Sequence, residues 1–261
     1  MSNSDWFTVE KIDAHTYAIS EYVHWERVHS YLLIGREQAA LIDTGIGIGD
    51  LHHVVEQLTE LPVIVLTTHV HWDHIGGHGS FKKHFVHKKE KSWLENGIPG
   101  LSIQQIRSGV FKDITKPIPP SVHPETYYPF KGKPSGLFQD NDIFELGERK
   151  IKIIDTPGHS PGHVCFYDES TGYLFSGDLI YTETPIYAFY PSTNPADLVK
   201  SFKKVARLEK EVSKVFGGHN ELGLDSSILY EAGEDAEYLI NHDLVRFGAG
   251  THHFKRLSVQ F

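Results

Sequence analysis

The chain has 261 residues, 39% hydrophobic and 23% charged, which is ordinary for a globular protein with a substantial core. Its formal net charge is −9, and its longer basic runs are only Lys82-Lys83 and Lys88-Lys89, so we expect no nucleic-acid partner. No apolar run approaches the ~20 residues that span a bilayer, and residues 1–6 lack the basic and apolar regions of a secretory signal. The single cysteine, Cys165, excludes a disulfide within the chain and suits a reducing compartment, so we expect a cytoplasmic protein without a membrane partner.

The first half of the chain predicts short strands separated by turns. Three segments rich in β-branched, aromatic and aliphatic side chains predict strands at residues 16–20, 31–34 and 39–43. After the glycine-rich turn at 45–49, Asp50 is a suitable N-cap for a helix that ends near Leu58. The continuous apolar run at 63–66 then predicts a strand that is buried on both faces.

Residues 88–141 have a different character from the rest of the chain. They combine a helical stretch at about 101–113 with a proline-rich segment at 116–120 and an aromatic patch at 127–130. An irregular insertion of this length inside a compact domain typically forms a lid or a substrate wall, and a plain surface excursion is the alternative.

The second half returns to alternating strands and helices. The apolar and β-branched segments predict strands at 142–146, 150–155, 163–168, 173–176 and 212–216. Helical patterns cover about 194–208 and 226–242, and an extended segment ends the chain. Because both halves mix helices and strands without a linker between them, we expect a layered α/β architecture and one domain over residues 1–261.

The segment His69-Val70-His71-Trp72-Asp73-His74 follows the buried strand directly and places four side chains able to bind metal within six residues. For these side chains to converge, the chain must pass sharply from strand to helix. Imidazole nitrogen and carboxylate oxygen suit zinc, manganese or iron. The spacing therefore indicates a metal site more specifically than a histidine-rich surface loop would.

Three later segments place further ligand types just past predicted strands. His159 lies in the turn Thr156-Pro157-Gly158-His159, Asp178 ends Phe175-Ser176-Gly177-Asp178, and His219 follows Gly217-Gly218. Side chains that follow neighbouring strands gather at one edge of a sheet, where binding and catalytic residues are common.

Together these motifs resemble the metallo-β-lactamase superfamily, from about Tyr31 to Asn220 and including Leu41-Ile42-Asp43-Thr44-Gly45. The resemblance implies an αβ/βα four-layer sandwich with two metal ions at one edge of its sheets. It implies that one ion is bound by His69, His71 and His159, the other by Asp73, His74 and His219, and that Asp178 bridges them. The expected cofactor is a pair of divalent metal ions. Zinc is the metal expected first, and iron and manganese are the alternatives.

Other residues near the motifs have roles that the sequence leaves open. Asp43 matches a position that orients a ligand histidine, and a strand-end cap of the following turn is the alternative. His163 fits a supporting role or strand packing better than a ligand role, since the two sites are already filled. The pairs His52-His53 and His252-His253 lack the motif spacing and are expected to face solvent, and Cys165 is expected in the core.

A pair of ions ~3.5–4 Å apart lowers the pKa of a shared water towards ~7 and polarises a carbonyl, so no protein nucleophile is needed. The expected function is therefore a dinuclear metallo-hydrolase in which a metal-bridging hydroxide attacks a carbonyl. Asp178 stands where several true β-lactamases have cysteine or serine, which resembles the glyoxalase II, acyl-CoA thioesterase and lactonase branches. The segments 42–47, 68–71 and 175–181 most resemble the acyl-CoA hydrolases and suggest a thioester substrate.

The candidate catalytic residues are Asp73, Asp178 and Tyr181, the last resembling a lactonase phenol that holds the substrate, with packing beneath the site as the alternative. Candidate apolar walls for a small-molecule substrate are Trp25, Tyr127, Tyr128, Tyr187 and Phe189.

Three other functions stay open at this point. A lactonase acting on acyl-homoserine lactones shares the ligand set, and a mono-iron persulfide dioxygenase keeps the same motif with different chemistry. A nuclease of this fold is disfavoured by the acidic balance of the chain. The oligomeric state is also open, a homodimer included.

Overall fold

The computed structural model describes residues 6–261, so the expectation that the N-terminus carries no secretory signal falls almost wholly outside the described residues. The chain forms two compact units. Unit 1 comprises the residues up to Val86 together with Glu90–Leu137 and Glu145–Glu148, and unit 2 comprises His87–Lys89, Phe138–Phe144 and Arg149–Phe261. Over the described range, no helix has the length and apolar content needed to cross a membrane.

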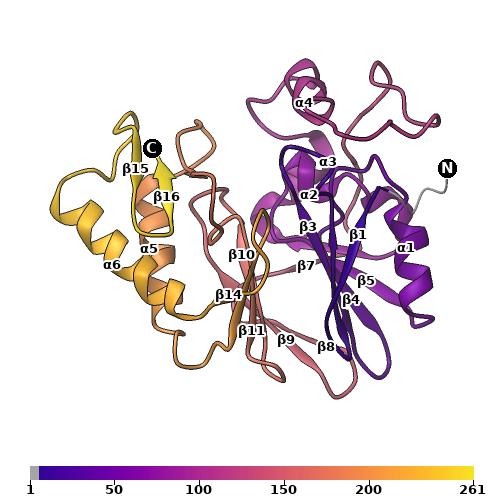
Figure 1. Ribbon diagram of the computed structural model, residues 1–261, viewed down its shortest axis with the longest axis horizontal. Coiled ribbons are helices and arrows are strands. Elements are labelled where there is room, and N and C mark those ends of the chain that lie inside the picture. Colours follow the sequence, from indigo (N-terminus) through magenta and orange to yellow (C-terminus); the bar gives the residue numbers. More distant parts are fainter. Residues whose placement is uncertain (1–5) are drawn as a thin grey trace. The chain divides into compact units, whose positions relative to one another are not determined.

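Unit 1 is built on a seven-stranded sheet in which the strands follow one another in chain order. The strands are β1 (Thr8–Asp13), β2 (Thr16–Ser20), β3 (His29–Ile34), β4 (Ala39–Ile42), β5 (Val63–Leu66), β6 (His84–His87) and β7 (Gly136–Phe138). The pairs from β1 to β4 are antiparallel, and β4, β5 and β6 are parallel. Parallel strands need a crossover, and the helix α1 (Leu51–Leu58) supplies it between β4 and β5 (Figure 1).

The helices of unit 1 begin where the sequence provides caps. The Asp50 side chain accepts a hydrogen bond from the backbone of His53 and starts α1, whose Leu51, Val54 and Val55 join the buried apolar cluster of the sheet. Ser102 and Gln105 form a capping box that starts α4 (Ile103–Val110). The other helices of the unit are α2 (Trp72–Ile75) and α3 (Lys91–Asn96), and 3-10 turns lie at His78–Ser80 and Lys88–Glu90.

Unit 2 contains a six-stranded sheet in the order β14-β13-β11-β10-β9-β8. Its strands are β8 (Ile143–Glu145), β9 (Lys150–Asp155), β10 (Val164–Asp168), β11 (Tyr173–Gly177), β13 (Lys214–Gly217) and β14 (Leu224–Asp225). Since β10 is antiparallel to both β9 and β11, and β13 is parallel to β11, the strands β9, β11 and β13 all end at the same edge of this sheet.

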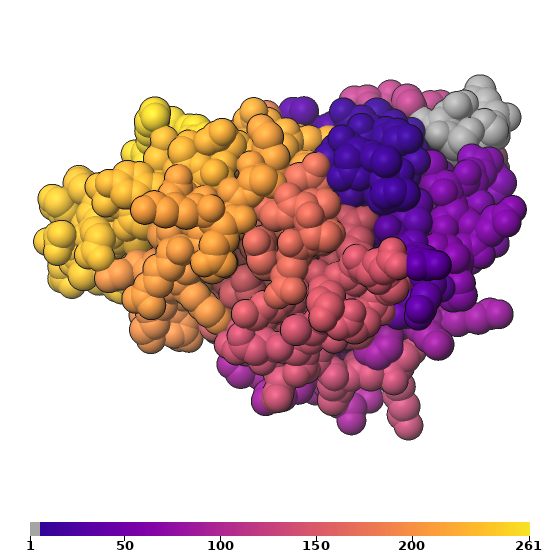
Figure 2. Space-filling view, turned by 90° about the horizontal axis from the view of Figure 1, so that it is seen from below, coloured from indigo at the N-terminus to yellow at the C-terminus, as the bar shows by residue number. Residues whose placement is uncertain are grey.

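Two long helices, α5 (Pro195–Ala206) and α6 (Ser227–Asn241), pack on each other in unit 2. Their buried faces join the core of the unit through residues such as Phe202 and Leu229. A small sheet of β12 (Ile186–Tyr187), β16 (Ser258–Gln260) and β15 (Thr251–His253) completes the unit. In the space-filling view the yellow C-terminal segment adjoins the orange residues that precede it (Figure 2).

The predicted strands and helices agree with the observed ones to within about two residues, apart from the helix expected at 101–113, which ends at Val110. Several of the observed elements were not predicted from the sequence, among them β1, β6, α3 and β12. β6 and β12 have few residues, and every side chain of the six-residue strand β1 is exposed or only partly buried, so these strands carry weak hydrophobic patterns. The expectation of one domain over residues 1–261, and of a lid formed by 88–141, stays a prediction.

Candidate metal centre

The four ligand-type residues of the first motif converge within unit 1. The strand β5 ends at Leu66, the chain turns through Thr67 and Thr68, and the short helix α2 begins at Trp72. As a result the ring centroids of His69 and His71 lie 4.5 Å apart, and those of His69 and His74 lie 4.2 Å apart. Asp73 Oδ2 is 3.4 Å from His74 Nε2, and His69, Asp73 and His74 are all buried. The sharp strand-to-helix passage predicted from the sequence is thus present.

Asp43, at the end of β4, holds this turn in place. One carboxylate oxygen accepts the backbone N–H of Thr68 at 2.8 Å, and the other accepts the Thr68 hydroxyl at 2.7 Å. The second oxygen also lies 2.8 Å from Nδ1 of His74. A carboxylate at Nδ1 selects the tautomer in which Nε2 is the ligand atom. Asp43 therefore supports the turn at Thr68 and orients His74, which is the first of the two roles expected for it.

The glycine-rich turn at 45–49 also holds α2 in place through hydrogen bonds. Gly76, which follows α2, donates its N–H to the Gly45 carbonyl at 2.8 Å. The neighbouring Ile46 donates its N–H to the Glu21 carboxylate at 2.8 Å, and its carbonyl accepts the hydroxyl of Tyr127 at 2.7 Å. Gly76 lies so close to this turn that a Cβ there would be 2.0 Å from the Ile46 carbonyl oxygen.

Glu21 is a residue that the sequence analysis did not single out. It is buried, and burial raises its pKa to about 7, against the lowering effect of hydrogen bonds from Trp6 and Ile46. A lone glutamate in an apolar stretch carries no motif, so no signal in the sequence marks it as part of the support for α2.

In unit 2 the three later ligand-type residues come together at the edge where β9, β11 and β13 end. His159 Nε2 lies 3.3 Å from Oδ2 of Asp178, and His219 Nε2 lies 3.1 Å from Oδ1 of the same carboxylate. All three side chains are buried. His219 Nε2 is also 3.3 Å from Oδ2, so Oδ2 contacts both imidazoles and Oδ1 contacts that of His219. The Asp178 carboxylate thus lies between the two imidazoles.

The orientation of these ligands is also set by backbone contacts. His159 Nδ1 lies 2.9 Å from the Tyr187 carbonyl, so this nitrogen carries the proton and Nε2 is the ligand atom. His163 accepts the backbone N–H of Asp178 at Nε2, at 3.0 Å, and its Nδ1 lies 2.9 Å from the hydroxyl of Thr156. His163 therefore supports Asp178 through the backbone, with both ring nitrogens engaged inside the protein.

The single cysteine is unsuited to nucleophilic chemistry. Cys165 is fully buried in β10, and burial raises the pKa of its thiol to about 12. This confirms its expected place in the core.

Tyr181 lies beside the ligands of unit 2. Its ring meets that of His219 edge-on at 5.2 Å between centroids, and its hydroxyl donates to the Pro185 carbonyl at 2.9 Å. The next residues are tied to the His219 loop as well, because Asn220 donates to the Thr182 carbonyl at 2.8 Å. Tyr181 thus packs on a ligand histidine, and its role in catalysis stays a prediction.

The five aromatic residues expected to form substrate walls have different surroundings. Trp25 is 37% exposed and donates to the Gly109 carbonyl, whereas Tyr128 is 61% exposed with Arg107 over its ring. Tyr127 is buried, and its hydroxyl serves the Ile46 turn. In unit 2, Tyr187 and Phe189 pack edge-on against each other. A substrate contact of any of the five stays a prediction.

An aromatic residue not expected from the sequence contacts a ligand in unit 1. Trp93, in α3, stacks on His71 with ring centroids 6.2 Å apart and planes 15° from parallel. Trp93 also lines a cavity of about 140 Å³, together with other residues of the 88–141 segment and Ile75 of α2. The apolar lining includes Ile98, Leu101, Ile106 and Phe130.

The chemistry of the donor set fits divalent transition metals. The seven residues offer imidazole nitrogens and carboxylate oxygens as ligand atoms, all from buried or half-buried side chains. Such nitrogen and oxygen donors, oriented by outer carboxylate and carbonyl groups, are typical of zinc and related ions. The residues present therefore fit the metals that the sequence analysis expected.

Comparison with known proteins agrees with this chemistry. The sequence profile of the Metallo-beta-lactamase superfamily matches residues 24–219. The acyl-coenzyme A thioesterase MBLAC2 of Gallus gallus is 29% identical over 232 residues, which cover 84% of this chain and 82% of that protein. The hydroxyacylglutathione hydrolase GloC of Haemophilus influenzae is 25% identical over 193 residues, covering 70% of this chain and 80% of that protein.

Solved structures share the fold. A metallo-beta-lactamase family protein from Thermus thermophilus superposes with a TM-score of 0.66 at 21% identity, covering 90% of this chain and 83% of that one. A metallo-beta-lactamase from Pontibacter korlensis gives a TM-score of 0.65 at 17% identity, covering 88% and 99%. This likeness confirms the predicted fold class, the αβ/βα sandwich.

Proposed function

Since the chain belongs to the metallo-beta-lactamase superfamily, we propose that it is a divalent-metal hydrolase that cleaves thioesters. The observation that carries the proposal is the Asp178 carboxylate, whose two oxygens lie 3.3 and 3.1 Å from the Nε2 atoms of His159 and His219. A carboxylate between two ligand imidazoles is suited to joining two metal sites. Thioesterase and hydroxyacylglutathione hydrolase relatives support the thioester as substrate class.

The proposed ligand sets follow the motif positions in the sequence. One ion is assigned to His69, His71 and His159, the other to Asp73, His74 and His219, with Asp178 shared. When bound, the ions would lower the pKa of a water molecule and polarise the thioester carbonyl. Zinc is the proposed metal, because a nitrogen-rich donor set with carboxylates is its usual environment.

The chain's own residues prepare this centre in three ways. Asp43 and the Tyr187 carbonyl select the tautomers of His74 and His159, so that Nε2 is the ligand atom in each. Burial of the ligands keeps bulk water away, which strengthens the electrostatic contacts. Cys165 is held as a thiol by its pKa of about 12, so hydrolysis without a protein nucleophile is the route that these residues support.

The surroundings of His71 support an acyl substrate. Trp93 stacks on His71 and at the same time lines the cavity of about 140 Å³ in unit 1, to which apolar side chains such as Ile98 and Phe130 contribute. An apolar acyl group placed beside His71 would bury hydrocarbon surface in this cavity, and each buried CH₂ stabilises a complex by about 0.8 kcal/mol. In this proposal the 88–141 segment is a substrate wall, and the cavity volume favours short acyl chains.

The test is a substrate panel on protein whose metal content has been measured. Thioesters, lactones, β-lactams and phosphodiesters are compared at equal protein concentration, and metal is removed and restored with zinc, manganese or iron. We expect thioesters to be cleaved most efficiently and the activity to return with metal. Preference for acyl-homoserine lactones would replace the thioester assignment with the lactonase one. One iron per chain together with thiol-dependent oxygen uptake would overturn the hydrolase proposal. A cytoplasmic location stays a prediction.

A further inference from the structure

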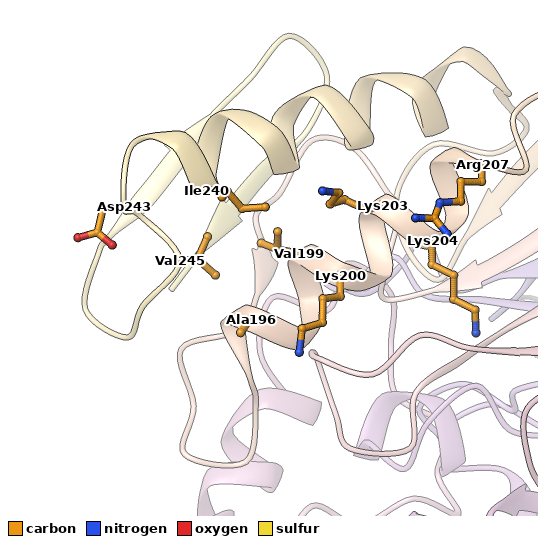
Figure 3. Close-up of a pocket in the computed structure, with 9 residues that line it drawn as sticks. All are labelled: Ala196, Val199, Lys200, Lys203, Lys204, Arg207, Ile240, Asp243 and Val245. Atoms are coloured by element: carbon orange, nitrogen blue, oxygen red, sulfur yellow. The ribbon is translucent and has the colours of Figure 1, made fainter.

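A groove runs along the surface of unit 2 between α5 and α6 (Figure 3). It has a volume of about 500 Å³, which lies within the range of small-molecule sites. Four basic residues line one side: Lys200, Lys203 and Lys204 of α5 and Arg207, which follows its last residue. Their spacing of three, four and seven residues places them on one face of the helix.

The floor of the groove is apolar. Figure 3 shows Val199 of α5 turned toward Ile240 of α6 and Val245 of the segment that follows it. Ile240 is 45% exposed, although its aliphatic side chain has no polar atom to place in water. Together these residues form an apolar strip beside a row of cations, which suits a ligand with one flat apolar part and one anionic part.

The charges of the groove are unusual for this acidic chain, whose formal net charge is −9. Lys200, Lys203 and Lys204 each have one carboxylate neighbour, at 3.0, 2.6 and 3.0 Å respectively. Lys204 also donates to the Asp155 carbonyl at 2.9 Å, so two contacts hold its ammonium group. The pairs of Lys200 and Lys203 are at least partly exposed, so each is worth little and can be exchanged for a ligand phosphate. Within residues 6–261, the Arg207 side chain has no ion-pair partner, and Asp243 is the one carboxylate in the lining.

The helix that carries the cations is tied to the turn that carries His159. At its start, Asn194 donates its N–H to the Gly158 carbonyl at 2.7 Å, and the Ser201 hydroxyl donates to the Pro157 carbonyl at 2.7 Å. Gly158 has a φ of +143°, and a Cβ there would lie 2.3 Å from the Cα of Leu198, so only glycine allows this close approach. A ligand in the groove therefore lies along a helix whose first turns pack on a ligand loop of the candidate metal centre.

We propose that this groove binds the phosphorylated adenosine end of an acyl-coenzyme A substrate. This inference rests on the proposed thioesterase function and names the leaving group of the thioester. The 3′-phosphate and the diphosphate of that group match the row of cations, and the planar guanidinium of Arg207 can hold a phosphate through two hydrogen bonds. The adenine ring, with its broad apolar faces, matches the exposed Ile240 and the half-buried Val245, which lie over the buried Val199.

The experiment compares two substrates with the same acyl group, one on coenzyme A and one on pantetheine, which lacks the nucleotide. Each is measured with the wild type, with Lys203→Ala/Arg207→Ala and with Lys210→Ala, an exposed lysine outside the groove lining. We expect the double variant to raise KM for the coenzyme A thioester about tenfold or more, with kcat unchanged. KM for the pantetheine thioester should stay unchanged, and the control should match the wild type with both substrates.

A binding measurement keeps the inference independent of turnover. Adenosine 3′,5′-bisphosphate is titrated calorimetrically into wild-type protein and into the double variant. We expect saturable binding that weakens at high salt and is lost in the variant. Equal KM changes for the two thioesters, no change at all, or a nucleotide affinity unaffected by the substitutions would overturn the groove assignment and leave the thioesterase proposal standing. If the wild type cleaves neither thioester, both proposals fail.

Discussion

The contact between Asp43 and His74 allows one prediction to be worked out in detail. The buried Asp43 carboxylate accepts hydrogen bonds from Thr68 N–H and Thr68 Oγ1 and lies 2.8 Å from His74 Nδ1. Asp43→Asn keeps the size of the side chain but turns one acceptor oxygen into an amide NH₂ group. If the remaining oxygen stays on the Thr68 N–H, the amide donates toward His74. Two donors then meet, unless His74 moves its proton to Nε2, the atom proposed to bind metal.

The magnitude follows from these contacts. Losing the carboxylate that orients a ligand histidine typically costs a factor of about 10 to 100 in metal affinity. That factor corresponds to about 1.4 to 2.8 kcal/mol, and the fold itself loses a charge-assisted hydrogen bond worth about 1.5 to 3 kcal/mol. We therefore expect weaker metal binding together with a lower thermal midpoint of the metal-free protein.

Metal affinity is measured by competition with a chromophoric chelator, and stability by thermal unfolding of metal-free protein. Asp50→Asn is the matched control, because Asp50 caps α1 through one backbone contact and asparagine caps helices equally well. If Asp43→Asn binds metal as tightly as the wild type does, the orienting role assigned to Asp43 is wrong.

Three further predictions concern the support of the site. The pKa of buried Glu21 is raised to about 7 from 4.5, so its folded form holds a proton that the unfolded chain has lost. The stability of metal-free protein should thus fall as pH rises from about 4.5 to 7, by up to about 3 kcal/mol, and in Glu21→Gln that pH dependence should be absent from thermal unfolding curves. Gly76→Ala should lower the free energy of unfolding by about 1 to 3 kcal/mol or more, because the added Cβ would meet the Ile46 carbonyl. Gly79→Ala is the control, since a Cβ there makes only ordinary contacts. Equal denaturation midpoints for the two variants would contradict the predicted clash at Gly76. Cys165 should react with iodoacetamide at pH 8 only after the protein is unfolded, as followed by mass spectrometry. The Cys165→Ala variant should keep the hydrolase activity of the wild type. Rapid labelling of the native protein would show that the thiol is reactive and the prediction wrong.

Local patterns in the sequence were enough for much of this protein. The capping residue Asp50 marked where α1 begins, and the apolar run at 63–66 marked a buried strand, because these signals depend on neighbouring residues only. The candidate ligand residues were likewise proposed from their spacing and their places at strand ends. Short or exposed elements such as β1 and β12 were missed, since a few residues at a sheet edge hold too little pattern to be recognised.

The sequence by itself determined the ligand types, the motifs and most elements, because each is written in a short stretch of chain. Only the tertiary structure decided which residues support those ligands. Asp43 and His74 are 31 residues apart in the sequence, and Glu21 and Ile46 are 25 residues apart, yet each pair is in hydrogen-bond contact. No sequence motif links the members of either pair. The row of cations from Lys200 to Arg207 was hidden for a similar reason. Basic residues three or four apart form no run in the sequence and become a single face only when the helix winds them together beside α6.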